Sequence, residues 1–172
     1  LWSRGLDPVA AAEALEGYSS DHKPVTVTYE HQGEPVPTPE WPDRLERVTY
    51  GGKPMDNGTK YAVMSAEAIL GYELTITQGC YSDSAVSASA TTHNGGGVVD
   101  LAPFDQARKV KVWRDNIGPA WFRPAIKGLW PDHIHAIVAG HPNLDPQAEA
   151  QVIKYNAGGD GLSGNTRDPN PY

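Results

Sequence analysis

The first third of the chain combines two short patterns with a proline-rich interruption. Apolar and polar residues alternate over 25–29, which predicts a half-buried strand. Before it, Asp7 and Pro8 lead into an alanine-rich run that stops at Gly17, a pattern typical of a capped helix. Four prolines fall within 33–42, and because proline has no backbone N–H to donate, this segment does not fit inside a sheet. We interpret 33–42 as an ordered surface excursion rather than a domain boundary.

Three further helices are predicted from apolar residues that recur at helical spacing. The first covers 59–70. Its expected apolar face consists of Tyr61, Met64, Ala68 and Ile69. The second covers about 105–114. The last begins at Asp145 and Pro146, an N-cap followed by a proline in the first turn, and ends before Gly158.

Short apolar runs predict strands at 74–77, 98–101 and 134–138. The segment 81–92 is rich in Ser and Thr and is expected to be a mobile loop, while the polar tail 159–172 is expected to wrap the surface. The order of elements predicts an α+β fold with an antiparallel sheet and its helices packed on one side.

Length, composition and charge narrow the classes of protein. With 172 residues, the chain fits a single domain over 1–172. Its 14 Lys and Arg against 21 Asp and Glu give a net charge of -7 without a basic cluster, which argues against nucleic-acid binding. The single cysteine excludes an internal disulfide framework and a multi-cysteine metal site. No run of apolar residues is long enough to predict a membrane span.

Two histidines in one predicted strand point to a metal site. His133 and His135 are two residues apart, so their side chains share one face of an extended segment. Burying two imidazoles without partners costs free energy, because each ring carries a donor and an acceptor. A divalent metal ion resolves this cost directly.

A second segment supplies the remaining ligands. Three consecutive glycines, at 95–97, let the backbone turn sharply between His93 and Asp100, which brings both residues to one site. Two neutral imidazoles and one carboxylate make a tetrahedral zinc site whose fourth position is left for water, the composition of a catalytic site. We therefore predict one Zn²⁺ held by His93, Asp100 and His135.

Asp132 is the candidate general base. It lies three residues before His135, and its carboxylate could take a proton from a metal-activated water and pass it to a leaving amine. Strict strand alternation would turn Asp132 away from the ligand face. Pro131 marks the start of the strand, however, where alternation need not hold.

Two spaced motifs resemble the zinc peptidases of the D-alanyl-D-alanine peptidase family. The first is H-x-x-G-x-x-x-D at His93, Gly96 and Asp100, and the second is D-x-x-H at Asp132 and His135. The family pattern is S-x-H-x-x-G-x-A-x-D followed by E-x-W-H. Neither motif is specific alone, but both occur here in the family's order and spacing.

The runs 77–79 and 133–135 also resemble the hedgehog signalling domain, which shares that fold. The resemblance covers about 72–140, within a motif-bearing core of about 59–158. It implies a zinc-dependent peptidase that cleaves peptidoglycan peptides containing D-amino acids. Bacterial cell-wall enzymes and phage endolysins are the usual members, so we expect a secreted or cell-wall-directed monomer whose partner is the peptidoglycan stem peptide.

The sequence departs from the family pattern at several positions. The differing residues are Thr91 for Ser, Val98 for Ala, Asp132 for Glu and Ile134 for Trp. The family's S-G-Y-R-S segment, whose Arg polarises the scissile carbonyl, reads Gln-Gly-Cys-Tyr-Ser at 78–82 and lacks the Arg. Tyr81, Gln78 or His133 would then supply the oxyanion contact. Gln78, Ser82 and Thr91 are the expected substrate contacts.

Several alternatives stay open at this point. The chain is either a peptidase, a zinc-containing binding module that has lost catalysis, or a loop-rich domain without metal. The bond cleaved is a terminal D-Ala bond, a D,D cross-link or an L-Ala–D-Glu bond. His133 either takes part in catalysis or orients its neighbour. Cys80 is expected to be a small, partly buried hydrophobe rather than a ligand, and His141 a surface loop residue.

Overall fold

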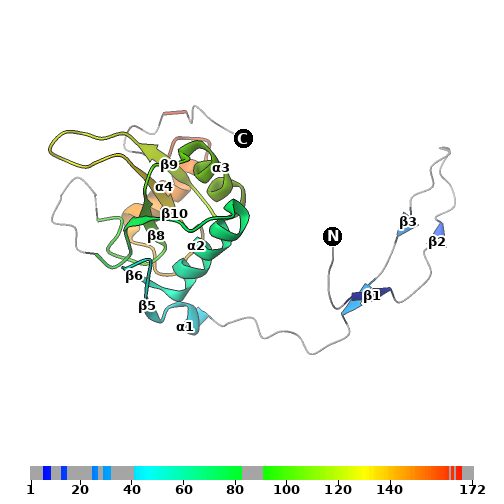
Figure 1. The fold of residues 1–172 in the computed structure, drawn as a ribbon. Coiled ribbons are helices and arrows are strands. Elements are labelled where there is room, and N and C mark those ends of the chain that lie inside the picture. The colour runs from blue at the N-terminus through cyan, green and yellow to red at the C-terminus, as the bar shows by residue number, and fades with distance from the viewer. Residues whose placement is uncertain are drawn as a thin grey trace. The chain divides into compact units, whose positions relative to one another are not determined.

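The computed structural model describes 41–82 and 91–162 continuously, and describes residues 164, 166 and 167 and four short strands near the N-terminus. The chain divides into two compact units, Leu1–Pro39 and Glu40–Tyr172 (Figure 1). The division falls within the proline-rich segment, of which residues 33–40 lie outside the described part. The single domain over 1–172 and the surface excursion at 33–42 stay predictions.

The first unit contains two pairs of antiparallel strands. β1 (Leu6–Pro8) pairs with β4 (Tyr29–His31), and β2 (Glu13–Ala14) pairs with β3 (Val25–Thr26). The predicted strand at 25–29 is confirmed where it is described. The predicted helix that begins at Asp7 is wrong, because β1 and β2 occupy it. A cap and a few alanines favour a helix only weakly, and a short helix needs a packed apolar face to persist.

The second unit is built around an antiparallel sheet with the strand order β7-β8-β10-β9. Its strands are β7 (Ile76–Gln78), β8 (Val98–Leu101), β9 (Ala120–Arg123) and β10 (His133–Ile137). The three predicted strands of this region are thus confirmed to within about two residues, while β9 was not predicted. A hairpin of β5 (Arg47–Tyr50) and β6 (Lys53–Asp56) precedes the sheet and was also missed.

The described residues of this unit also form four helices, and the last three match the predictions. They are α1 (Trp41–Arg44), α2 (Asn57–Leu70), α3 (Gln106–Asn116) and α4 (Pro146–Asn156). The Asp145 side chain caps α4 by accepting a hydrogen bond from the Gln147 backbone N–H, as its sequence pattern predicts. Among the described helices, none is both long and apolar enough to span a membrane.

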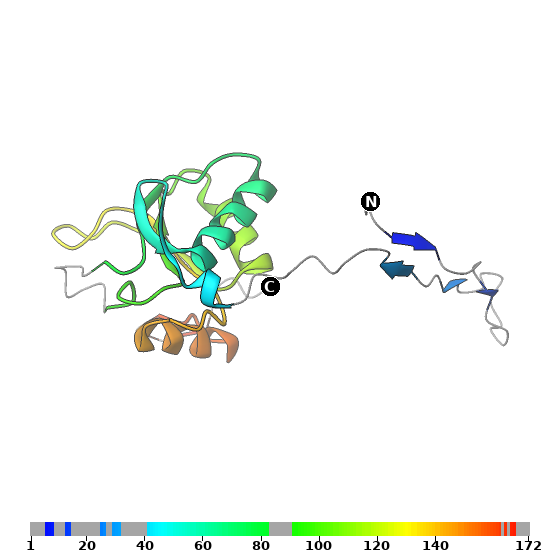
Figure 2. The same cartoon turned by 90° about the horizontal axis from the view of Figure 1, so that it is seen from below.

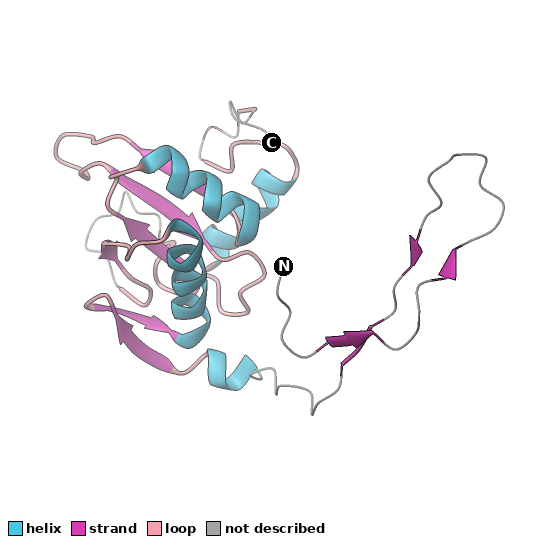
Figure 3. Cartoon of the chain, turned by 45° about the vertical axis from the view of Figure 1, so that its right-hand side comes forward, coloured by secondary structure: helices cyan, strands magenta, loops and turns pink. Residues whose placement is uncertain are grey.

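The two faces of the sheet are covered by different helices. Side chains such as Val99 and Ile134 point into a core with α2 and α3, which lie side by side in Figure 3. Val98 and Trp121 point to the opposite face and pack against Val152 of α4. Figure 2 shows α4 (orange) apart from α2 and α3. The α+β prediction is confirmed, but the helices are not all on one side, because α4 covers part of the face that carries His135.

The apolar face predicted for α2 is wrong. Tyr61, Met64 and Ile69 are 43%, 43% and 49% exposed, respectively. The buried positions of the helix are Thr59, Val63, Ala66 and Leu70. Both sets have helical spacing, so periodicity alone cannot choose between them. The choice follows from Asp56, the last residue of β6, whose side chain caps the helix and so fixes which side faces the sheet.

Candidate metal centre

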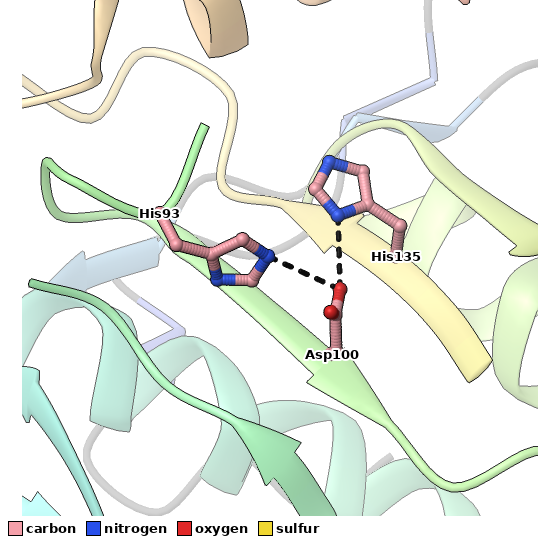
Figure 4. A group of neighbouring side chains, drawn as sticks. All are labelled: His93, Asp100 and His135. Carbon is pink, nitrogen blue, oxygen red and sulfur yellow. Dashed lines mark hydrogen bonds and ion pairs between the residues drawn. The ribbon is translucent and has the colours of Figure 1, made fainter. Parts of the chain in front are cut away.

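The sheet brings two predicted ligands to opposing positions on adjacent strands. His135 of β10 lies opposite Asp100 of β8, and residues directly opposite in an antiparallel pair point to the same face. His93 reaches the same place from the loop before β8. Figure 4 shows the three side chains pointing toward one another. Asp100 and His135, which are 35 positions apart in the chain, are thereby combined with His93 in one cluster, as the two motifs predict.

The distances within this cluster suit a metal ion. Asp100 Oδ1 lies 3.3 Å from His93 Nε2 and 2.9 Å from His135 Nδ1. One ligand atom from each residue lies within 4.8 Å of the other two, and all three residues are buried. Ligands of a tetrahedral zinc ion, each at about 2.0–2.1 Å, are separated by about 3.3 Å from one another. His93, Asp100 and His135 could therefore hold a metal ion.

The imidazole rings of His93 and His135 each form a hydrogen bond through the nitrogen that faces away from Asp100, and this bond orients the ring. His93 Nδ1 lies 2.9 Å from the Gly79 carbonyl oxygen, which can only accept, so this nitrogen carries the proton. His135 Nε2 lies 3.2 Å from Gln151 Oε1 and donates to it in the same way. Neutral rings held like this direct their unprotonated nitrogens at a carboxylate oxygen. In this arrangement three acceptors meet at one point, which a cation bound between them would satisfy.

When no cation is bound, the ring nitrogens that face Asp100 can instead carry protons and donate to its carboxylate. Burial opposes ionisation of Asp100, but hydrogen bonds with His135 and His93 hold its pKa well below the ordinary value. Burial lowers the pKa of His135, against the opposing effect of Asp100. A carboxylate and a neutral imidazole are the forms that bind a metal, so these ligands are ready to bind at neutral pH.

The three glycines before β8 are required for two different reasons. Gly97 has a φ of 77°, a left-handed conformation that favours glycine. At Gly95 and Gly96 the φ angle is ordinary, but an added Cβ would lie 2.3 Å from Asn143 O and 2.2 Å from Asp56 Oδ2, respectively. The predicted sharp turn is confirmed. Most of its glycine requirement, however, comes from close packing.

A buried polar cluster behind this turn was missed by the sequence analysis. Asp56 accepts hydrogen bonds from the Tyr81 hydroxyl at 2.7 Å and from the Thr59 hydroxyl at 2.8 Å. His141 Nε2 donates to the same carboxylate at 3.1 Å, and the side chains of Asp56 and His141 are fully buried. The prediction that His141 is a surface residue is therefore wrong. Thr59 Oγ1 in turn accepts from the Gly97 N–H at 2.9 Å, so the cluster fixes the turn that leads into β8.

The predicted catalytic residues occupy different surroundings. His133 lies beside the metal ligands, with its Nε2 3.9 Å from Asp100 Oδ2. Its Nδ1 donates to the Pro131 carbonyl at 2.8 Å, so Nε2 is the nitrogen that faces the site. Asp132 is exposed. The Tyr81 hydroxyl belongs to the Asp56 cluster and also accepts from Asn143 Nδ2 at 2.9 Å, rather than pointing at the ligands.

The predicted substrate contacts are spread more widely. Gln78 of β7 lies opposite Asp100, and its amide donates to Ser82 Oγ at 2.9 Å. Thr91 Oγ1 donates to Asp145 Oδ1 at 3.1 Å, near the start of α4. Residues 83–90 of the predicted mobile loop lie outside the described part of the chain. Gln78 is thus next to the ligands, while Thr91 is bonded to the helix cap.

Three residues near the ligands were not assigned to the site from the sequence, which indicates only a core or cleft-wall role for Trp121. Trp121 stacks on the His135 ring, with centroids 5.9 Å apart and an interplanar angle of 22°. Gln151 of α4 accepts from the same ring. Arg123 lies opposite His133.

Cys80 is buried, more completely than predicted, and its thiol lies 3.0 Å from the Val98 carbonyl oxygen. Burial raises the pKa of this thiol to about 11, so it stays protonated at neutral pH. Cys80 is therefore part of the core beneath β8. It is not one of the three residues that could hold the ion.

Comparison with protein-family models, with curated proteins and with solved structures gives no match for this chain. The resemblance to the zinc peptidases therefore remains a prediction that rests on the two motifs.

Proposed function

We propose that the protein is a zinc-dependent peptidase that hydrolyses peptide bonds of bacterial peptidoglycan, with D,D- or L,D-specificity. One observation supports it above all: a ligand atom from each of His93, Asp100 and His135 lies within 4.8 Å of the other two, and all three residues are buried. This donor set of two histidines and one aspartate leaves a coordination position for water or substrate, which is typical of catalytic rather than structural zinc. The two family-like motifs supply the substrate class. A secreted or phage-delivered protein, acting as a monomer on the wall, fits this proposal.

In this proposal, different residues bind the metal, stabilise the oxyanion and transfer the proton. When bound by His93, Asp100 and His135, zinc supplies a water of lowered pKa and a Lewis acid for the peptide carbonyl. His133 presents Nε2 next to Asp100, and because Nδ1 already donates to Pro131, Nε2 would donate to the developing oxyanion in the imidazolium form of the ring. Asp132, which is exposed and lies three residues before the ligand His135, is proposed to carry the proton from water to the leaving amine.

The exposed carboxylate of Asp132 provides the direct test. Purified peptidoglycan treated with the zinc-loaded protein is expected to release new amino groups. Asp132→Ala should lower that rate by about 10²–10⁴-fold, the usual contribution of a general base, and should retain one zinc per chain. Asp115→Ala, at an exposed carboxylate on α3, is the matched control and should react normally. Normal turnover by Asp132→Ala would remove the role of this residue, and no release by the wild-type protein would contradict the peptidase function.

A zinc-containing binding module is the second candidate. It is favoured by the absence of an arginine at 78–82 and by the Tyr81 hydroxyl, which is bonded to Asp56 instead of facing the ligands. Such a module would sediment with peptidoglycan without releasing amino groups. The digestion above distinguishes the two functions in one experiment.

Gln151 is expected to tune the metal affinity from outside the ligand set. Its carbonyl oxygen fixes the proton on His135 Nε2, so Gln151→Ala frees the ring to rotate or to change tautomer. The zinc dissociation constant should rise by about 10–100-fold in competition with a chelating dye. Gln147→Ala, at an exposed position on the same helix, is the control. Equal zinc affinity in Gln151→Ala and the control would show that this hydrogen bond does not orient the ligand.

A further inference from the structure

Arg123 faces the same side of the sheet as the metal ligands. Along β10, His135 lies opposite Trp121 and His133 lies opposite Arg123. Two residues along a strand span about 7 Å. Arg123 is thus placed beside the metal centre rather than within it, at the distance of a neighbouring group on a bound substrate.

Among the described residues, the Arg123 guanidinium has an aromatic neighbour but no anionic hydrogen-bond partner. The guanidinium lies 4.9 Å from the centroid of the Trp130 ring, and that ring in turn contacts His133 edge-on, with centroids 6.3 Å apart. Within the described part of the chain, no side chain or carbonyl forms a hydrogen bond or ion pair with this guanidinium. Arg123 is also partly buried. Burial lowers its pKa, and Asp100 acts in the opposite direction.

Asp100, the nearby carboxylate, does not serve as a hydrogen-bond acceptor for the Arg123 guanidinium. Asp100 Oδ1 is already shared by His93 and His135, and its other oxygen faces His133. A partly desolvated guanidinium retains five N–H donors, and leaving them without acceptors costs free energy. Aromatic stacking on Trp130 holds the planar group in place, which reduces the entropy lost when an anion binds.

We propose that Arg123, held against Trp130 beside His133, binds a free carboxylate of the substrate next to the metal centre. The guanidinium fork matches a carboxylate in two parallel hydrogen bonds, which a single carbonyl oxygen cannot form. The offset of about 7 Å along the strand suits a carboxylate on the residue that follows the scissile bond. This inference rests on the proposed peptidase function and narrows it to carboxypeptidase action, in which the carboxyl-terminal residue of a peptide is removed.

Two dipeptides that differ only at the terminus test this assignment. N-acetyl-D-alanyl-D-alanine and its carboxyl-terminal amide are titrated into the zinc-loaded full-length protein, and binding is followed by NMR. Release of D-alanine is measured in the same samples. The wild-type protein should bind the acid about 10–100-fold more tightly than the amide, as expected for charge-assisted hydrogen bonds. Arg123→Gln should reduce this preference to within about twofold without changing the zinc content.

Two further variants distinguish the bidentate geometry of the Arg123 guanidinium from its charge, and both from the loss of an arginine elsewhere on the protein. Arg123→Lys keeps the charge but loses the bidentate geometry, so an intermediate preference is expected. Arg108→Gln removes an exposed arginine on α3 and should keep the full preference. Equal binding of acid and amide by the wild-type protein, a preference that survives in Arg123→Gln, or no binding of either dipeptide would overturn the subsite. Binding of the acid without release of D-alanine would contradict the peptidase function while leaving the subsite in place.

Discussion

Asp100→Asn is expected to remove the metal from the protein. Asp100 Oδ1 is the atom that both histidines approach, at 3.3 and 2.9 Å, and its carboxylate is the only negative charge in the ligand set. A neutral amide in its place is a much poorer ligand. If each ligand carries about a quarter of the binding free energy of a structural zinc site, the affinity falls by about two to three orders of magnitude.

The measurement is zinc per chain after dialysis, together with a dissociation constant from dye competition. Asp115→Asn makes the same chemical change at an exposed carboxylate on α3 and should keep its zinc. Circular dichroism checks that both variants are folded. A folded Asp100→Asn protein that still carries one tightly bound zinc would show that the three residues do not form the metal centre.

The ligands could be predicted because each lies in a short segment whose pattern suggests its local geometry. His133 and His135 share a face in any extended strand, and the glycines after His93 let the chain turn tightly into β8. The sequence patterns therefore restrict geometry locally. That the two segments meet in space had to be assumed, and the structure brings them together through the antiparallel pairing of His135 with Asp100.

The residues around the ligands could not be predicted, because they come from elements with weak patterns. β9 is four residues long and both its faces are covered, so Trp121 and Arg123 carry no clear alternation of burial. Gln151 lies on an amphipathic helix, where a glutamine is ordinarily a surface residue. Its position follows from α4 packing on the face that bears His135, the opposite of the one-sided arrangement predicted from the order of elements.

The Asp56 cluster could not be predicted from the sequence for a related reason. Asp56 and His141 are separated by 85 positions, and each is flanked by turn-like residues that favour a surface interpretation. The first residue of a helix-cap pattern is usually exposed, but here the cap is also the centre of a buried network. Pairwise tertiary contacts of this kind leave no periodic trace in one sequence.

Asp56→Ala is expected to destabilise the second unit by about 3–5 kcal/mol. The substitution removes the cap of α2 and leaves His141, Tyr81 and Thr59 without their shared acceptor in a fully buried site. Urea unfolding followed by tryptophan fluorescence reports on this unit, because Trp113 and Trp121 lie in its cores. Asp115→Ala should unfold within about 0.5 kcal/mol of the wild-type protein, as expected for an exposed position.

Acid should weaken the same network in a defined pH range. Burial opposes ionisation, but hydrogen bonds from His141, Tyr81 and Thr59 lower the pKa of Asp56 from 3.8 to about 2. Because the folded-state pKa lies below the unfolded one, the carboxylate stabilises the fold above about pH 4, and this stability is lost as the pH falls toward 2. The difference corresponds to about 2 kcal/mol. Asp56→Asn should therefore lose less free energy of unfolding than the wild-type protein between pH 5 and pH 2. Parallel losses in the two proteins across this range would mean that the Asp56 carboxylate is not held ionised by the hydrogen bonds from His141, Tyr81 and Thr59.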